Sequence, residues 1–136
     1  MKRAPAILVF GIIVLTAAWA VPQAVFTGLI FDARHLSFVP SASPKILDED
    51  GRELYGSAYV GKEWVEKQGI VGYAKTPEEA GENQRVAGNP LMVKALKVTG
   101  PNSRDLVVSN EDARKIRELA RHLNFLEHAK VMIVVP

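Results

Sequence analysis

The chain has 136 residues, with 17 Lys and Arg against 15 Asp and Glu, and it contains no cysteine. The absence of cysteine excludes disulfides, thiol catalysis, zinc–thiolate sites and a lipidated cysteine anchor. The basic excess is Lys2 and Arg3, and the first acidic residue is Asp32. The rest of the chain is therefore balanced in charge, which gives no electrostatic reason to expect nucleic acid binding.

Residues 1–20 have the three parts of a secretory signal. Two basic residues open the segment, an apolar run follows at 7–15, and the small residues Ala18 and Ala20 favour cleavage before Val21. The alternative is an uncleaved anchor, because the uncharged part is barely long enough to span a bilayer. In both cases we predict a domain on the periplasmic or extracellular side of a bacterial envelope, which touches the membrane only through 1–20 if these residues are retained.

The residues that follow, 21–136, are predicted to form a single domain that begins with a strand. Val, Phe, Ile and Thr are frequent in 24–33, which favours a strand, and 36–43 is interpreted as a looped connection. The Asp-Gly pair at 50 and 51 supplies the positive φ that a tight turn needs. It predicts a hairpin between the short runs 45–47 and 52–55.

A short helix and a short strand come next. The helix is predicted over 61–68, with Trp64 and Val65 facing inward and Gly69 as the C-cap. The strand is predicted over 70–74.

Another short helix is predicted to begin at Thr76–Glu79. Thr can cap it, Pro fits the first helical position, and two glutamates face the positive end of the helix dipole. The run 91–99 (LMVKALKVT) indicates one strand, 100–103 a turn, and 105–108 a second strand. We therefore expect 91–99 and 105–108 to form a hairpin.

The longest helix is predicted to follow Ser109, which can accept a hydrogen bond from the amide of Asp112. Apolar residues recur at spacings of three and four and predict one buried stripe: Ala113, Ile116, Leu119, Ala120, Leu123 and Leu126. The closing run 130–135 (KVMIVV) indicates a strand in a covered position.

These elements predict the α+β class: a single compact domain with a mixed sheet, a hairpin, and one long helix in the C-terminal half that packs on the sheet. If 105–108 and 131–135 are neighbours, they would be parallel strands joined by a right-handed crossover.

Asp32, Arg34 and His35 follow the first strand and could bind an anion or move a proton. A small hydrolase built on Asp32 and His35 is one possibility. Strand alternation sends His35 to the opposite face, however, which favours a structural Asp32–Arg34 pair.

Four carboxylates lie between Asp48 and Glu53, but an EF-hand loop would need Glu at its twelfth position, which is Tyr59. A solvated hairpin turn is the favoured interpretation. His122 and His128 are predicted to lie on the last helix, six residues apart, so they do not form the i, i+4 pair of a helical metal site. We predict no metal site, no cofactor and no catalytic residues.

The loop 85–90 (RVAGNP) carries Arg85 and Asn89 directly before a strand, where binding groups are often placed. Tyr73 belongs to a group of aromatic residues that could line a groove, although core or cross-strand packing is the alternative. If these three residues converge with Arg34 in a concave pocket, they would bind a small ligand or an anion. An ordinary structured connection is the alternative for the loop.

Several segments resemble a group of short exported bacterial proteins, which are similar to segments in or beside LPP20-type envelope lipoproteins and flagellar-associated envelope proteins. The segments are 27–34 (TGLIFDAR), 43–56 (SPKILDEDGRELYG), 71–74 (VGYA), 85–90 (RVAGNP) and the closing DLVVSNEDARKIR…FL…VMIVV. The resemblance implies residence in the envelope and no catalytic residue. Without cysteine, lipid anchoring is excluded.

Together these observations predict a non-catalytic envelope module with a protein-interaction or assembly role, and another envelope protein as its partner. The alternative is a periplasmic domain that binds a small ligand or an anion.

Overall fold

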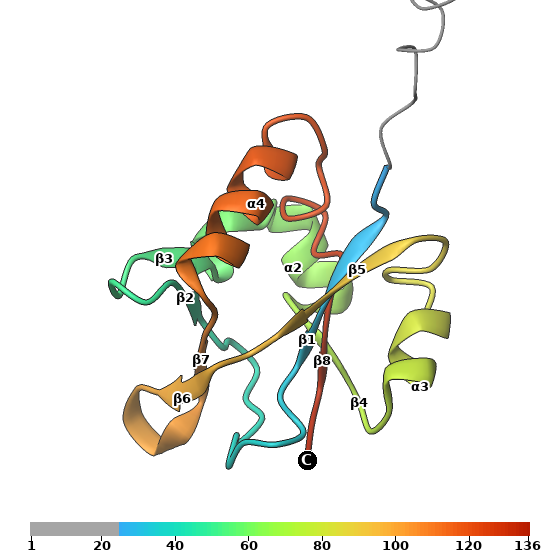
Figure 1. Ribbon diagram of the computed structural model, residues 1–136. Helices are drawn as coiled ribbons and strands as arrows, with labels where there is room; N and C mark the ends of the chain where they lie inside the picture. Colours follow the sequence, from blue (N-terminus) through green and yellow to red (C-terminus); the bar gives the residue numbers. More distant parts are fainter. Residues whose placement is uncertain (1–24) are drawn as a thin grey trace, which may run out of the picture.

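Between residues 25 and 136, the part of the chain that this computed structural model describes, there are eight strands and three α-helices (Figure 1). The segment predicted as a signal, 1–20, lies outside the described residues. The elements are β1 (Gly28–Asp32), β2 (Ile46–Leu47), β3 (Glu53–Tyr55), η1 (Ser57–Tyr59), α2 (Lys62–Gln68), β4 (Gly72–Ala74), α3 (Pro77–Glu82), β5 (Pro90–Lys94), β6 (Lys97–Thr99), η2 (Pro101–Ser103), β7 (Asp105–Val107), α4 (Asn110–Ala120) and β8 (Val131–Val134).

Four strands form a parallel sheet in the order β4–β8–β1–β5. All four residues of β8 are buried, which confirms the covered position predicted for 130–135. Leu29 and Phe31 of β1 belong to the larger core cluster and Ile30 to a smaller one, because successive side chains of a strand point to opposite faces. The parallel sheet is therefore covered on both faces.

The other four strands form a mixed sheet in the order β3–β2–β7–β6. The β2–β3 and β6–β7 pairs are antiparallel hairpins, and β2 pairs with β7 in parallel. Gly51 has φ +82° in the predicted Asp-Gly turn. Ile46 and Leu106 of this sheet lie in the same core cluster as Leu29 and Phe31, so the two sheets share one core. The α+β class and the single compact domain are confirmed, and the second sheet is a feature that the pattern did not reveal.

The prediction of one strand over 91–99 is wrong, because this segment forms two strands in different sheets. The amide of Ala95 still donates to the carbonyl of Asp32, the last residue of β1 (3.1 Å), whereas the amide of Leu96 donates to the carbonyl of Val107 in β7 (2.7 Å). A pattern of apolar residues indicates extended backbone but not the strand with which it pairs. For the same reason β7 and β8 are not neighbours, and the crossover considered between them does not form.

The two short helices begin and end near the predicted residues. The Thr76 side chain accepts from the amide of Glu79 at the start of α3, and α3 packs against β1, β4 and β8. Helix α2 ends at Gln68, and Gly69 is its C-cap with φ +72°. Trp64 packs against the core, but Val65 is 38 % exposed, so the inward position predicted for Val65 is wrong. Only one side of this short helix reaches the core.

Helix α4 begins as predicted, with the Ser109 hydroxyl accepting from the amide of Asp112 (3.0 Å). It ends at Ala120, earlier than the apolar stripe suggested. Phe125 is buried beside Leu126, yet in a continued helix it would lie about 180° from Ile116. Ile116 and Phe125 nevertheless belong to the same core cluster, so the helix has to end between them.

The two histidines predicted to lie on this helix both follow it. The prediction that they lie on it is wrong, because α4 ends at Ala120. His128 stacks on Trp64 with ring centroids 4.5 Å apart. Among the helices formed by residues 25–136, none combines the length and the apolar character that crossing a bilayer requires.

Candidate functional site

Arg34 forms a two-pronged pair with Asp32 at the end of β1. Its Nε and Nη2 donate to the two carboxylate oxygens at 3.0 and 2.8 Å, and its amide donates to the same group. These hydrogen bonds lower the pKa of Asp32 more than its partial burial raises it. The structural pair favoured from the sequence is present.

His35 lies beside this pair but faces another group. Its Nε2 contacts the carbonyl of Ala95 at 2.8 Å. Asp32, Arg34, His35 and Lys94 line an open hollow of about 330 Å³ at the carboxyl ends of β1 and β5. No hydroxyl side chain is among the residues of the described chain that line this hollow.

Arg85 is half-buried and is held by backbone carbonyls. Its guanidinium donates to the oxygens of Gln68 (2.5 Å), Gly69 (3.3 Å) and Ala129 (2.9 Å). Burial lowers the pKa of this side chain. Arg85 thus ties the end of α2 to Ala129, which has a positive φ and lies just before β8.

Asn89 and Tyr73 are likewise engaged with the backbone. The Asn89 side chain donates to Val25, and its backbone exchanges hydrogen bonds with Thr27. The Tyr73 hydroxyl donates to the carbonyl of Ser41 (2.6 Å) and accepts from its amide (3.0 Å). Burial raises the pKa of Tyr73.

The structure separates Arg34 from Arg85 and Asn89. Arg85 and Asn89 lie at the amino ends of the strands in the parallel sheet, whereas Arg34 follows the carboxyl end of β1. Because all four strands run in the same direction, Arg34 lies at the opposite end of the sheet from Arg85 and Asn89. A single pocket that joins Arg34 to Arg85 and Asn89 is therefore not formed.

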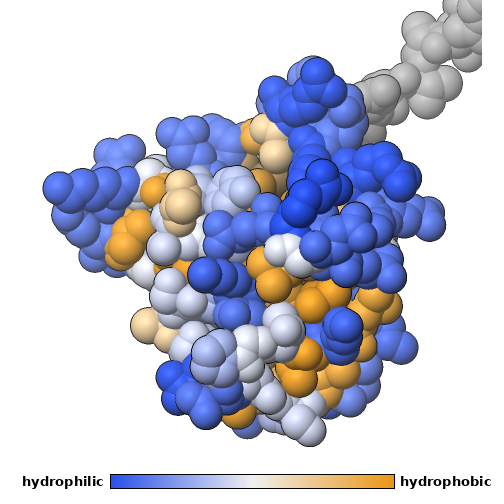
Figure 2. Space-filling model, turned by 90° about the vertical axis from the view of Figure 1, so that its left-hand side faces the viewer, coloured by the Kyte–Doolittle hydropathy of each residue, from blue (hydrophilic) through white to orange (hydrophobic). Residues whose placement is uncertain are grey.

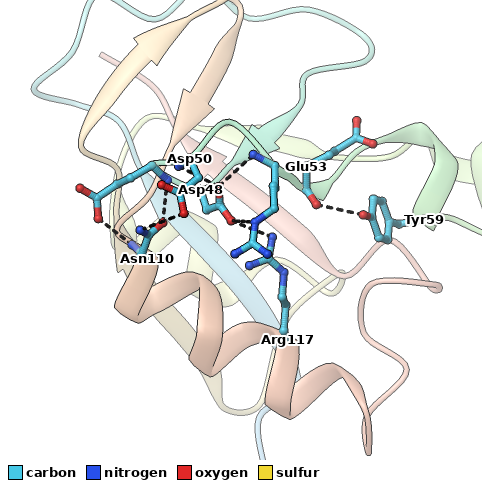
Figure 3. Close-up of polar contacts among 8 residues, drawn as sticks. Asp48, Asp50, Glu53, Tyr59, Asn110 and Arg117 are labelled. Carbon is cyan, nitrogen blue, oxygen red and sulfur yellow. Dashed lines mark hydrogen bonds and ion pairs between the residues drawn. The ribbon is translucent and has the colours of Figure 1, made fainter.

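Asp48, in the turn between β2 and β3, is the buried acidic residue of the described chain, with 1 % exposure. One of its oxygens accepts from the amides of Asp50 (3.0 Å) and Arg52 (2.9 Å). The other contacts Arg52 Nε and Arg117 Nη2, both at 3.1 Å (Figure 3). The solvated turn predicted here is wrong for Asp48, because α4 supplies a cation that covers it.

Burial by itself would raise the pKa of Asp48. The hydrogen bonds from the Arg52 amide, the Arg117 side chain and the Asp50 amide, together with the charge of Arg52, outweigh that effect and hold the pKa below its usual range. Asp48 is therefore a fixed negative charge that orients two guanidinium groups.

A second contact fixes the same turn to the start of α4. The Glu49 amide donates to the Asn110 side-chain oxygen (2.9 Å), and the Asn110 amide donates to the Glu49 carboxylate (2.8 Å). Figure 3 shows this exchange beside the Asp48 pair. The hairpin and the helix are thus held against each other at two points.

Two adjoining hollows lie between this hairpin and α4, and we call them together the arginine groove. Its polar half, about 430 Å³, is lined by Asp50, Arg52, Asn110, Arg114, Arg117, Glu118 and Arg121. Its apolar half, about 310 Å³, is lined by Leu54, Tyr59, Ala120, Leu123, Asn124, Leu126 and Glu127, and by Arg117 and Arg121 again. Figure 2 views the side of the molecule on which β2, β3 and β6 lie, where hydrophobic residues are exposed among many hydrophilic ones.

Arg114, Arg117 and Arg121 recur at spacings of three and four, so they lie along one side of the helix and its last turn. The sequence contains this signal, but charged residues on a helix usually indicate only a solvated face. What could not be read from it is that the β2–β3 hairpin stands opposite these arginines.

Among the described residues, no group of three or more His, Asp or Glu is arranged to hold a metal ion. The arginine groove offers guanidinium donors at one end and an apolar wall at the other.

The fold is that of a small α+β domain in which a parallel and a mixed sheet share one core. The family model described as Treponema pallidum Tp0624, second domain, matches residues 28–136. The chain therefore belongs to this family of bacterial domains, and the match covers every strand and helix from β1 to β8. A comparison with curated proteins gave no match.

Proposed function

We propose that this chain is a non-catalytic, exported module of the bacterial envelope that binds another envelope protein through the arginine groove. The observation that carries the proposal is the groove itself, in which a polar hollow adjoins an apolar one. Its two walls, the hairpin and α4, are held against each other by the contacts of Asp48 and Glu49. Protein interfaces combine an apolar centre with arginine and tyrosine in this way.

Export and envelope residence rest on two observations. Residues 1–20 resemble a signal segment, and the rest of the chain resembles short exported bacterial proteins that are similar to segments in or beside LPP20-type lipoproteins and flagellar-associated envelope proteins. Membership in the Tp0624 second-domain family agrees with a bacterial origin. The more specific link to those lipoproteins stays part of this proposal.

A small ligand or anion is the alternative occupant, because each hollow has a volume at the low end of the range for small-molecule sites. The polar side chains in the other predicted positions are bound to backbone or to each other, which makes the arginine groove the better candidate for either occupant.

Crosslinking in the native bacterium tests the proposal. We expect a tagged chain to recover the same envelope protein reproducibly, and the double variant Arg114→Glu, Arg121→Glu to lose it. The control, Lys94→Glu with Arg104→Glu, makes the same change in charge at exposed positions outside the groove and should retain the partner. Failure of the unaltered chain to recover any reproducible partner would contradict the proposal.

A further inference from the structure

We infer that the partner presents a segment in which carboxylates flank a large apolar side chain, and that this segment lies along α4 in the arginine groove. The inference rests on the proposed function and specifies the chemistry that the partner must offer. It follows from three features of the groove: its line of cations, its apolar end, and the rigidity of its walls.

The arginines of the groove are suited to bind carboxylates of a partner. Arg117 is positioned by Asp48, and Arg121 contacts Glu118 at 3.0 Å. Arg114 is exposed and forms no ion pair with another described residue. A guanidinium has five N–H donors in a planar fork that fits a carboxylate. The polar half also contains the carboxylates of Asp50 and Glu118, but with Arg52 its arginines outnumber them. Each of these arginines therefore keeps donors for an acidic residue of a partner.

The apolar end accepts a side chain. Leu54, Leu123 and Leu126 line it. Tyr59 is 42 % exposed, and its hydroxyl donates to the carbonyl of Glu53 (2.9 Å). Because Arg117 and Arg121 line both hollows, an apolar residue in this end has arginines directly beside it. Aromatic or aliphatic anchors in such positions supply much of the affinity of protein interfaces.

The shape of the groove distinguishes its occupant. An inorganic anion would leave the apolar end unfilled, and a bilayer surface favours a projecting apolar face, whereas these residues line hollows. The contacts of Asp48 and Asn110 fix both walls before binding, which reduces the ordering that association would otherwise require. A protein segment of acidic and apolar residues uses both ends at once.

Photo-crosslinking in the native bacterium tests the location. Benzoylphenylalanine replaces Tyr59 in the full chain, and Met92 in a control chain, because Met92 is exposed to a similar extent (45 %) but lies on β5 outside the groove. We expect the Tyr59 position to capture a peptide rich in Asp and Glu beside Leu or Phe. Capture of a lipid, or capture of the partner from Met92 alone, would overturn the inference.

Binding to a defined probe tests the chemistry. The probe is a fluorescein-labelled Glu-Asp-Leu-Phe-Glu-Asp peptide added to the purified full chain. We expect polarisation to report binding that weakens with added salt. Binding should fall by about tenfold or more in the Arg114→Glu, Arg121→Glu variant and remain in the Lys94→Glu, Arg104→Glu control.

Peptides that carry Lys for each acidic residue, or Ser for Leu and Phe, should also bind about tenfold more weakly or worse. Equal binding of the three peptides would reject this chemistry. If the pull-down finds a partner but these tests fail, the proposed function survives and the inference falls. If no partner is recovered at all, the proposed function itself fails.

Discussion

At the scale of single residues, Asp48 and Arg85 carry charges that the fold uses internally. Asp48 is buried and satisfied by two backbone amides and two arginines, one of them from α4. Arg85 binds three carbonyls at the end of α2 and before β8. In both cases a polar side chain in a loop joins segments that are distant along the chain, so its main effect is on stability.

We predict that Asp48→Asn lowers the midpoint of thermal unfolding by about 10 °C. The amide keeps the shape of the carboxylate but not its charge, so Arg117 loses its negatively charged partner. Circular dichroism measures the midpoint. Asp50→Asn, at an exposed position of the same turn, is the control and should change it little; a similar loss in both variants would refute the role of Asp48.

Replacing Arg85 by Met keeps the stem and removes the donors. We expect Arg85→Met to lower the free energy of unfolding by about 1.5–3 kcal/mol, since hydrogen bonds from a charged group are lost and carbonyls are left unpaired. Urea denaturation measures the change. Gln84→Met, at the exposed neighbouring position, should stay within about 0.5 kcal/mol, and equal effects of the two substitutions would count against the assignment.

At the scale of elements, the start of β1 depends on close packing against the loop before β5. A Cβ at Gly28 would approach the Val86 side chain to 2.7 Å and the carbonyl oxygen of Lys130 to 2.9 Å. Neither neighbour is the free end of a flexible side chain. The RVAGNP loop, which the sequence suggested as a possible binding segment, therefore forms a packing contact with Gly28 at the amino end of the parallel sheet.

Gly28→Ala should accordingly lower the free energy of unfolding by about 1–3 kcal/mol through overpacking. Gly81→Ala is the matched control, because a Cβ at Gly81 in α3 meets nothing within 4 Å and alanine should stabilise the helix by about 0.5–1 kcal/mol. The opposite signs are the test, measured by urea denaturation. A loss in both variants would show that packing at Gly28 is not the cause.

At the scale of the whole molecule, two sheets and α4 meet in one core, and the Asp48 pair lies where the mixed sheet joins α4. Protonation of Asp48 at low pH therefore affects the contact between the mixed sheet and α4. In the unfolded chain Asp48 takes up a proton near the ordinary Asp pKa of about 3.9, whereas its pKa in the folded domain is lower. The unfolded state then binds more protons, and stability must fall as the pH drops through this window.

We predict a full contribution of Asp48 above about pH 5 and its progressive loss below about pH 4. Urea midpoints measured across this range should fall steeply for the unaltered chain and less steeply for Asp48→Asn. Parallel curves for the two proteins would show that Asp48 does not carry the acid sensitivity. Asp32 also has a lowered pKa, but it is more exposed and contributes less.

Much of the fold could be predicted because its local signals are strong. The Asp-Gly turn, the Thr76 and Ser109 caps and the Gly69 helix end depend on residues close in sequence, and each is confirmed. The early end of α4 could not be predicted, because it depends on burying Phe125, which only the assembled core requires.

The candidate site was less accessible to sequence reasoning. Polar residues in conspicuous loops, such as Asn89, are consumed by backbone contacts that join distant segments. The arginines of α4 have an ordinary helical pattern, and their interest arises from the hairpin placed opposite them, about sixty positions away in the sequence.

The sequence by itself determined the α+β class, most turns and helix starts, the absence of thiol chemistry and the signal-like character of residues 1–20. Only the tertiary structure decided that 91–99 serves two sheets, that Asp48 is buried, and that α4 and the β2–β3 hairpin form a groove. The physical reason is the distance along the chain between the residues that set each feature. Backbone conformation follows from neighbouring residues, whereas strand partners, burial of charge and hollows depend on segments that meet only when the chain is folded.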